Sequence, residues 1–270
     1  MKLTEARVLL TGAAGGIGAA SAHALLAAGA CVLLTGRDSA RLEQLAQSLQ
    51  QAHAAPARVE WFAGDLLTDT GVADLATRAA RWQCNVLLHN AGVGLFGQFE
   101  HASADAIEQV LATNLLAPML LTRALLPHLR AQASARVVCV GSVLGGLGLP
   151  GYAVYSASKF GLRGFAEALR RELGKGPLRV QYLGPRSTKT ALNSASAEAF
   201  NRATGTASDP PETVASALVD LLRSGQPERF LGVPERFAVR MNGCAPALLD
   251  GAFSSHREHL LHPQVQAAAE

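Results

Sequence analysis

Several features that define other classes of protein are missing from this chain of 270 residues. Its four cysteines, Cys31, Cys84, Cys139 and Cys244, lie far apart without a Cys-x2-Cys pair, and its eight histidines show no metal-ligand spacing. This pattern excludes a disulfide framework and a zinc motif, and it favours reduced thiols in a cytoplasmic protein without a bound metal. The formal net charge is only +3, and no Lys/Arg cluster is interleaved with aromatic residues. We therefore expect no nucleic-acid partner.

The sequence also lacks the segments that carry a protein to or through a membrane. The first residues, 1–7, are mixed and polar, without the apolar core of a signal peptide. The stretch 8–36 contains no Asp, Glu, Lys or Arg, but it holds several glycines and His23. Its β-branched run, glycine turn, Ala-rich segment and second apolar run favour a buried strand–helix–strand unit. We expect no integral membrane segment.

Aromatic residues are scarce as well, at 5% of the chain, whereas 49% of residues are hydrophobic and 26 are glycine. This composition is typical of helices packed closely on a parallel sheet. Short apolar runs predict strands at 7–11, 31–35, 58–62, 85–89, 136–140 and 178–183, with a weaker seventh at 229–232. Helical periodicity predicts helices at 17–28, 39–51, 69–82, 103–129, 152–173 and 211–223.

The alternation of strands and helices predicts an α/β fold: a doubly wound, Rossmann-type parallel sheet of about seven strands with helices on both faces. We expect one domain over residues 1–233, in which the polar, weakly periodic segment 184–211 is a mobile loop beside the site. The remainder, 234–270, places apolar residues from Phe237 to Phe253 at helical spacing. It is expected to pack on its own domain or on a partner subunit, and contact with a membrane surface is a further alternative.

A glycine-rich turn joins the first predicted strand to the first predicted helix. It contains Gly12, Gly16, Ile17 and Gly18. Glycines permit a tight turn and let the backbone approach a pyrophosphate, which then rests on the helix N-terminus. The spacing differs from the commoner Gly-x-Gly-x-x-Gly, and a packing role is the alternative. In this strand–turn–helix context the turn predicts a bound dinucleotide.

The residues after the second predicted strand bear on the choice of cofactor. An acidic residue there accepts from the 2′-hydroxyl of NAD, whereas an arginine can bind a 2′-phosphate. Gly36 supplies no carboxylate, Arg37 supplies a guanidinium, and Asp38 is placed as an ordinary helix N-cap. NADP(H) is therefore preferred and NAD(H) remains possible, with a solvated surface charge as the alternative reading of Arg37.

Further candidate ligand contacts follow the third and fourth predicted strands. Asp65, next to Leu66, either contacts the adenine end of the cofactor or caps a turn. Asn90, Ala91 and Gly92 let the backbone come close to a ligand at the C-terminal edge of the sheet.

Tyr155 and Lys159 are four residues apart in a predicted helix, and so they share one face at about 6 Å separation. An ammonium there favours the ionised phenol and lowers its pKa from about 10. Ser142, just after a predicted strand, could point at the carbonyl oxygen that the phenol protonates. Asn114 lies inside an apolar helix, which disfavours Asn, so it is expected to make a backbone hydrogen bond or hold an ordered water.

Together these residues resemble the short-chain dehydrogenase/reductase family over about residues 5–232. The matching elements, in order and at the family's usual separations, are Thr11-Gly-x3-Gly16-x-Gly18, Asp65, Asn90-Ala91-Gly92, Asn114, Ser142 and Tyr155-x3-Lys159. The resemblance implies an NAD(P)-linked interconversion of a carbonyl and an alcohol.

The resemblance also implies a role for each catalytic residue. Tyr155 is the expected general acid in reduction and, as phenolate, the base in oxidation, and Ser142 is expected to hydrogen-bond the same oxygen. Lys159 would lower the pKa of the tyrosine and bind the nicotinamide ribose. Asn114 would hold the water that links Lys159 to solvent. A homodimer or homotetramer is implied too.

Two departures from the family's pattern stand out. His89 replaces an asparagine at a position that is expected to be tolerant. After the sixth strand, the usual Pro-Gly-x-Val-x-Thr reads Pro185-Arg186-Ser187-Thr188-Lys189-Thr190. Carboxamide binding is expected from Pro185, the Thr188 backbone and Thr190. Arg186 either contacts an anionic substrate or the cofactor, or it is a solvated arginine.

The substrate is expected to be a small molecule, either a carbonyl or an alcohol. Residues 144–151 and the loop beyond Thr190 would wall the pocket with small apolar surface, which suits an apolar ketone or a 3-oxoacyl group better than a sugar. The leading hypothesis is thus an NADPH-dependent reductase. The alternatives are an NAD-linked alcohol dehydrogenase and a non-catalytic NAD(P)-binding regulator.

Overall fold

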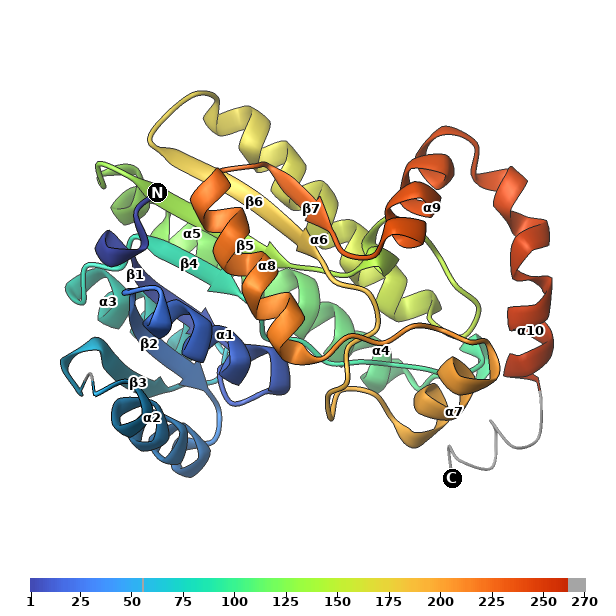
Figure 1. The fold of residues 1–270 in the computed structure, drawn as a ribbon, viewed down its shortest axis with the longest axis horizontal. Helices are drawn as coiled ribbons and strands as arrows, with labels where there is room; N and C mark the ends of the chain where they lie inside the picture. Colours follow the sequence, from blue (N-terminus) through green and yellow to red (C-terminus); the bar gives the residue numbers. More distant parts are fainter. Residues whose placement is uncertain (55, 262–270) are drawn as a thin grey trace.

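The computed structural model describes residues 1–54 and 56–261, and its centre is one parallel sheet (Figure 1). The strands are β1 (Arg7–Thr11), β2 (Cys31–Gly36), β3 (Val59–Ala63), β4 (Val86–His89), β5 (Ala135–Val140), β6 (Leu178–Gly184) and β7 (Glu228–Phe230). They lie in the order β3-β2-β1-β4-β5-β6-β7, and every neighbouring pair is parallel. The predicted α/β class and sheet are confirmed.

Helices cover both faces of the sheet, which is why the strands are apolar on both sides. On one face lie α1 (Gly16–Ala27), α2 (Ser39–His53) and α8 (Pro211–Ser224). On the other lie α3 (Asp69–Arg81), α4 (Ala104–Leu111), α5 (Ala117–Arg130) and α6 (Ala153–Leu173). Short 3₁₀ helices occur at Leu3–Glu5, Pro56–Arg58, Phe99–His101 and Val143–Gly145.

The strand order reverses between β1 and β4, and this reversal positions the site. Strands β2 and β3 lie to one side of β1, while β5 to β7 lie beyond β4. Connections that leave β1 and β4 in opposite directions open a crevice at the carboxyl ends of these two strands. The residues after β1, β4 and β5 therefore meet at one edge.

One helical run in the part that the structure describes, Ala104–Arg130, is long and apolar enough to cross a membrane by length and composition alone. It comprises α4, a π-helical turn at Ala112–Leu116 and α5. Leu121, Leu125 and Leu129 belong to the core on one face of the sheet. A core helix passes the same length and composition test, so this run is weak evidence for a span. The expectation of no integral membrane segment stays a prediction.

The segment expected to be a loop, 184–211, contains a helix, α7 (Ala195–Ala203). The Ser194 side chain caps it by accepting from the Ala197 N–H at 3.2 Å, and Phe200 is fully buried. This helix was not predicted, because nine helical residues that bury only a few side chains leave little periodicity in the sequence; the mobility of the segment stays a prediction.

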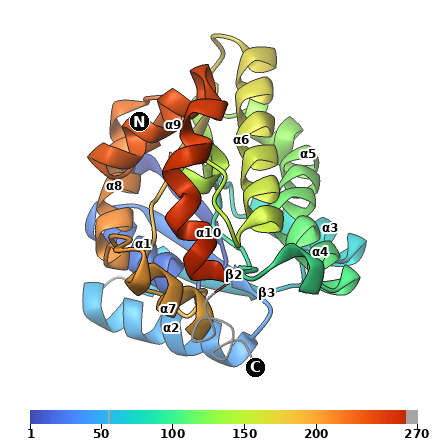
Figure 2. The same cartoon turned by 90° about the vertical axis from the view of Figure 1, so that its right-hand side faces the viewer.

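The C-terminal extension folds back onto its own chain. It consists of α9 (Val233–Cys244), a 3₁₀ segment (Pro246–Phe253) and α10 (Ser254–Leu260), and the helical run breaks just before Pro246. Val239 packs with Leu144 and Leu147, and Asn242 donates to the Gly146 carbonyl at 3.1 Å. Figure 2 shows α9 and α10 descending between α8 and α6 toward α7. Residues 262–270 of the extension lie outside the described residues, and contact with a partner subunit stays a prediction.

Candidate active site

Two neighbouring cavities lie along the C-terminal edge of the sheet. The larger, of about 750 Å³, contains Ser142, Tyr155 and Lys159 in its wall. The smaller, of about 560 Å³, is lined by the glycine turn and Arg37. The two cavities form one continuous site, because several residues line both of them. These shared residues include Ile17, Asn90, Gly92 and Thr190.

The glycine turn forms a backbone cradle, and side chains at its glycine positions would clash with neighbouring atoms. Gly12 has a φ of +63°, and a Cβ there would lie 2.6 Å from the Ala91 Cα. A Cβ at Gly18 would overlap the Gly12 carbonyl oxygen, and one at Gly16 would lie 2.7 Å from Thr190 Cγ2. With α1 beginning at Gly16, the cradle fits a pyrophosphate on a helix N-terminus.

Asn90 holds this turn from the end of β4. Its Nδ2 donates to the carbonyl oxygens of Thr11 and Gly12, each at 3.0 Å. In return, Thr11 Oγ1 accepts from the Asn90 and Ala91 N–H groups, also at 3.0 Å. The hydroxyl of Thr11 therefore joins two of the predicted contact segments. The sequence analysis gave it no role, although a threonine at the last position of a buried strand was a signal.

The far end of the smaller cavity is lined by Arg37, Asp65 and Leu66. Asp65 accepts from the Leu67 N–H at 3.0 Å, so the carboxylate caps a turn while also facing the cavity. A second guanidinium, that of Arg41, lines the same end and was missed from the sequence. Its signal was its place four residues after Arg37, at the start of a predicted helix.

Asp38 separates the two arginines and has a structural role. Its Oδ1 accepts from the Arg41 N–H at 3.0 Å and caps α2, as the sequence predicts. The Asp38 carboxylate is engaged by the helix backbone, and position 36 is a glycine, so Arg37 and Arg41 bring two guanidinium groups to this end of the cavity, where Asp65 is also present. Such an end suits an anionic group such as a phosphate.

Ser142, Tyr155 and Lys159 meet in the larger cavity, although they come from two elements. Ser142 follows β5, and its Oγ accepts from the Leu144 N–H at 3.0 Å. Tyr155 and Lys159 lie in the first turns of α6, with Lys159 Nζ 5.6 Å from the centre of the Tyr155 ring. Lys159 Nζ also donates to the Val140 carbonyl at 3.3 Å.

Burial controls the titration of this pair. It raises the pKa of Tyr155 to about 12, and the neighbouring Ser142 side chain offsets part of that rise. It also lowers the pKa of Lys159 to about 8. Desolvation thus dominates the pKa of Tyr155 in this structure, and the expectation that Lys159 lowers it stays a prediction. At neutral pH the phenol keeps its proton, as a general acid must.

Asn114 lies fully buried in the π-helical turn between α4 and α5. Its Oδ1 accepts from the Val93 N–H and its Nδ2 donates to the Val93 carbonyl, both at 2.9 Å. The same Nδ2 donates to Ser158 Oγ at 3.1 Å. Of the two expected purposes, the structure shows the backbone hydrogen bond, which fixes the loop after β4 against α6. The role in holding a water near Lys159 stays a prediction.

His89, the first departure from the family's pattern, ends β4 inside the core. Its Nε2 lies 2.8 Å from Thr122 Oγ1 on α5, and burial lowers its pKa to about 3. The imidazole is therefore neutral at physiological pH.

Pro185, Thr188 and Thr190 all line the larger cavity, as the carboxamide-binding segment is expected to do. Thr188 is buried, its Oγ1 donates to the Arg186 carbonyl at 3.0 Å, and its own carbonyl accepts from Asn193 at 2.9 Å. The Thr188 hydroxyl thus braces its own segment.

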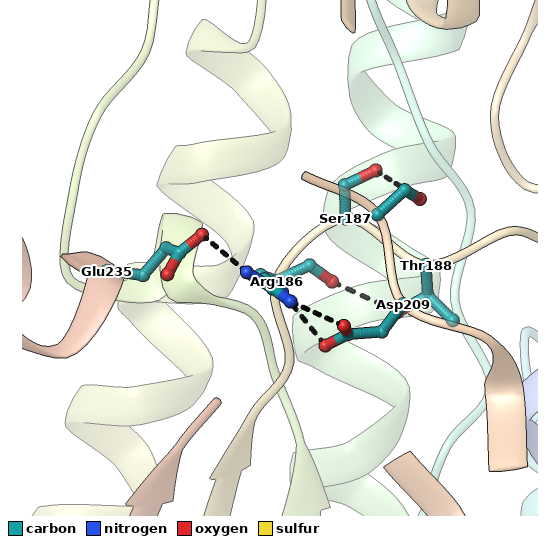
Figure 3. A network of polar contacts seen from close by, with 6 residues as sticks. Arg186, Ser187, Thr188, Asp209 and Glu235 are labelled. Carbon is teal, nitrogen blue, oxygen red and sulfur yellow. Dashed lines mark hydrogen bonds and ion pairs between the residues drawn. The ribbon is translucent and has the colours of Figure 1, made fainter. Parts of the chain in front are cut away.

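Arg186 forms an ion-pair cluster, called here the Arg186 cluster, with Asp209 and Glu235 (Figure 3). Its Nε and Nη2 donate to the two Asp209 oxygens at 3.0 and 2.7 Å, and Nη1 lies 3.4 Å from Glu235 Oε1. These carboxylates raise the pKa of the guanidinium above its ordinary value. Arg186 is therefore not a freely solvated arginine, because it joins the segment after β6 to α9; it also lines the larger cavity, and its contact with a ligand stays a prediction.

Aromatic side chains, scarce in the chain, gather on one wall of the larger cavity. The ring of Phe96 lies 4.8 Å from that of Tyr152 and 5.0 Å from that of Phe200, measured between centroids. The His256 ring lies 5.8 Å from Phe200 and 5.3 Å from Phe253, which extends the wall onto the C-terminal segment. None of these residues was predicted, because they come from four distant segments. The apolar residues expected from 144–151 and beyond Thr190 do line the cavity; they are Leu144, Leu147, Leu149 and Leu192.

No metal centre accompanies this site in the part of the chain that the structure describes. Within residues 1–54 and 56–261, no three His, Cys, Asp or Glu side chains are placed to hold a metal ion. Cys31, Cys84, Cys139 and Cys244 are free thiols.

Comparison with known proteins places this geometry in a family. Residues 6–200 match the family model described as short chain dehydrogenase. A dehydrogenase/reductase SDR family member 7B of Xenopus laevis is 30% identical over 274 residues, which cover 94% of this chain and 82% of the relative. The ketoacyl reductase HetN of a Nostoc species is 35% identical over 173 residues, 63% of this chain and 59% of HetN.

Solved structures agree. A metagenomic short-chain oxidoreductase in complex with NADP is 30% identical with a TM-score of 0.70, covering 86% of this chain and 97% of the other. A Burkholderia phymatum short chain dehydrogenase/reductase in complex with NAD has a TM-score of 0.81 at 23% identity, covering 92% and 96%. At that identity the second likeness speaks for the fold alone.

Proposed function

Because this chain belongs to the short-chain dehydrogenase/reductase family and is an NAD(P)-dependent oxidoreductase, we propose that it is an NADPH-dependent reductase of an apolar ketone or 3-oxoacyl substrate. The observation that carries the proposal is the continuous pair of cavities. One end holds two arginines, and the other holds a buried, protonated tyrosine under an apolar, aromatic wall.

The two arginines support NADP(H) over NAD(H). Arg37 and Arg41 line the end of the smaller cavity, where Gly36 offers no carboxylate to a ribose hydroxyl. A guanidinium forms charge-assisted hydrogen bonds to a phosphate, each of about 1.5–3 kcal/mol. A 2′-phosphate on the cofactor would supply the anion that this end can bind; of the two solved relatives, one is a complex with NADP and the other a complex with NAD.

The cofactor supplies the hydride, and the protein supplies position and the proton. Tyr155, whose pKa is raised to about 12, is protonated at neutral pH and donates to the carbonyl oxygen as the alcohol forms. Ser142 donates a hydrogen bond to the same oxygen and stabilises its developing charge. Lys159, reaching Val140 from α6, is placed to hold the ribose hydroxyls of the cofactor.

The cavity wall supports an apolar substrate. Phe96, Tyr152 and Phe200 offer ring faces, and Leu144 and Leu147 add aliphatic surface. Such a wall suits a flat or chain-like hydrophobic group beside the carbonyl. Among the relatives, HetN is named a ketoacyl reductase, in keeping with the 3-oxoacyl class.

The proposal includes a cytoplasmic homodimer or homotetramer. Apolar side chains that the monomer leaves exposed support self-association. They lie on α4, the π-helical turn, α5 and α6, and they are Leu111, Leu116, Met119 and Phe160.

The test is a cofactor titration at saturating carbonyl substrate. Arg37→Ala is expected to raise the KM for NADPH by about 10- to 100-fold, the value of one lost charge-assisted hydrogen bond, and to leave the KM for NADH unchanged. Arg171→Ala, which removes an exposed arginine on α6, is the matched control and should change neither KM. A wild-type preference for NADH, or no loss of NADPH affinity in Arg37→Ala, would support the NAD-linked dehydrogenase instead.

Catalysis is tested separately with Tyr155→Phe. This variant should bind NADPH like the wild type but lose about 10²–10⁴-fold in kcat. If the wild type binds NADPH yet reduces nothing across a broad panel of ketones and 3-oxoacyl thioesters, the non-catalytic regulator becomes the better account.

A further inference from the structure

Tyr182, in the middle of β6, holds the main chain of Ser142 at two points. Its phenol oxygen accepts from the Ser142 N–H at 3.0 Å and donates to the Ser142 carbonyl at 2.9 Å. The side chain is fully buried and lines neither cavity, so it reaches the site only through Ser142.

Two glycines make room for this phenol. A Cβ at Gly141 or at Gly145 would overlap the Tyr182 hydroxyl oxygen. Neither glycine has a positive φ, so both are needed for space and not for their backbone conformation. The far side of the ring packs on Phe230 of β7 at 5.7 Å between centroids. The Tyr182 hydroxyl therefore occupies space that is open only because residues 141 and 145 are glycines.

The Tyr182 phenol hydrogen-bonds to the main chain just after β5, where the hydrogen bonding between β5 and β6 ends. Gly141 N–H donates to the Leu183 carbonyl and Val143 N–H donates to the Pro185 carbonyl, each at 2.8 Å. Between them, both main-chain polar groups of Ser142 have the Tyr182 phenol as partner. The Ser142 carbonyl also accepts from the Gly145 N–H at 3.0 Å, so loss of the phenol would leave the buried Ser142 N–H without its partner. The Ser142 backbone would then shift to find new partners, and its Oγ would move with it.

We propose that Tyr182 is a positioning residue for the reaction: it fixes the Ser142 backbone and thereby aims the Ser142 hydroxyl at the oxygen that Tyr155 protonates. The kinetic part of this inference rests on the proposed function. A displacement of about 1 Å in a catalytic group is enough to lower the rate substantially, so the hydrogen bonds from Tyr182 matter to turnover as well as to packing.

Tyr182→Phe tests the idea, because it keeps the ring and removes only the hydroxyl. It is expected to lower kcat about tenfold and to leave the KM for NADPH unchanged. The deciding measurement is a double-mutant cycle with Ser142→Ala. If Tyr182 acts through Ser142, then Tyr182→Phe should cost tenfold in the wild-type background and almost nothing in the Ser142→Ala background.

A merely structural role gives a different pattern. Phe230→Leu is the control, since it disturbs the packing of the Tyr182 ring without touching a hydrogen bond to Ser142. Its effect on kcat should be the same in both backgrounds. An equal, multiplicative loss for Tyr182→Phe in both backgrounds, or no loss in either, would overturn the proposal.

Hydrogen exchange followed by mass spectrometry gives a readout that needs no substrate. In Tyr182→Phe, amides of residues 141–145 should exchange at least tenfold faster, while those of α5 should not change. Unchanged exchange at 141–145 would overturn the positioning role even if the enzyme proves active. If exchange is faster in Tyr182→Phe but the wild-type protein shows no turnover, the role of Tyr182 in fixing the Ser142 backbone stands, and the result counts against the proposed function alone.

Discussion

Replacing Arg186 with alanine would leave two carboxylates without their shared cation. The Arg186 side chain is 25% exposed, and those of Asp209 and Glu235 are 12% and 22% exposed. Removing one partner of a buried ion pair costs about 3–5 kcal/mol, because the remaining charge stays desolvated. Since a quarter of this guanidinium reaches solvent, we expect a loss of about 3 kcal/mol in the free energy of unfolding, at the low end of that range.

Thermal melting followed by circular dichroism measures the loss. For a domain of this size, 1 kcal/mol corresponds to about 2–4 °C in Tm, so Arg186→Ala should melt about 6–12 °C below the wild type. Arg171→Ala is the matched control, because it breaks an exposed pair with Glu167 in which the arginine is 74% exposed. Exposed pairs contribute about 0–1 kcal/mol, so the control should melt within about 3 °C of the wild type.

Two outcomes would refute this reasoning. One is an equal Tm for Arg186→Ala and Arg171→Ala. The other concerns Arg186→Lys, which keeps the positive charge but loses the bidentate hydrogen bonding to Asp209. A wild-type Tm for this variant would show that the bidentate geometry contributes nothing to stability. Arg186→Ala combined with Asp209→Asn should recover part of the lost stability, because the unpaired carboxylate is removed.

Two further predictions concern His89 at the end of β4 and Gly18 in the glycine turn that follows β1. His89→Asn should flatten the acid dependence of stability: burial holds the pKa of His89 at about 3, whereas the unfolded chain binds a proton near 6.5. The free energy of unfolding of the wild type therefore falls as the pH drops below about 6.5, and His89 accounts for about 1.4 kcal/mol of that loss per pH unit. The measurement is the shift of the urea midpoint between pH 7 and 5.5. An equal shift in the wild type and in His89→Asn would contradict the prediction. Gly18→Ala should weaken NADPH binding in a fluorescence titration, because its Cβ overlaps the Gly12 carbonyl; wild-type affinity would count against the cradle. The control Gly164→Ala, in an open part of α6, should instead raise stability by about 0.5–1 kcal/mol.

The sheet could be predicted almost to the residue, because its central strands are buried on both faces. A strand covered by helices on both sides must be apolar throughout, so each one appears in the sequence as a short hydrophobic run. β1 was predicted at its observed bounds, Arg7–Thr11, and the weak seventh run corresponds to β7, which has only three residues. The short helix α7 left no such mark, since it buries only three side chains.

The site was predictable where the residues concerned follow a strand or share a helix face. Ser142 and Asn90 lie directly after strands whose carboxyl ends meet, and Tyr155 and Lys159 are one helical turn apart. The Arg186 cluster was not predictable, because Asp209 and Glu235 come from segments whose placement depends on the whole fold. The sign of the Tyr155 pKa shift was missed for a related reason: the sequence shows the neighbouring charge but not the depth of burial.

That sign bears on the direction of the reaction. With the pKa of Tyr155 raised to about 12, the fraction of phenolate at pH 7 is on the order of 10⁻⁵. Reduction uses the phenol in its abundant protonated form, whereas oxidation requires the rare phenolate as base. Lys159, with its pKa lowered to about 8, is still protonated in about 90% of molecules at pH 7, yet burial dominates the pKa of Tyr155. The burial of Tyr155 therefore keeps the phenol in the protonated form that the proposed reduction would use.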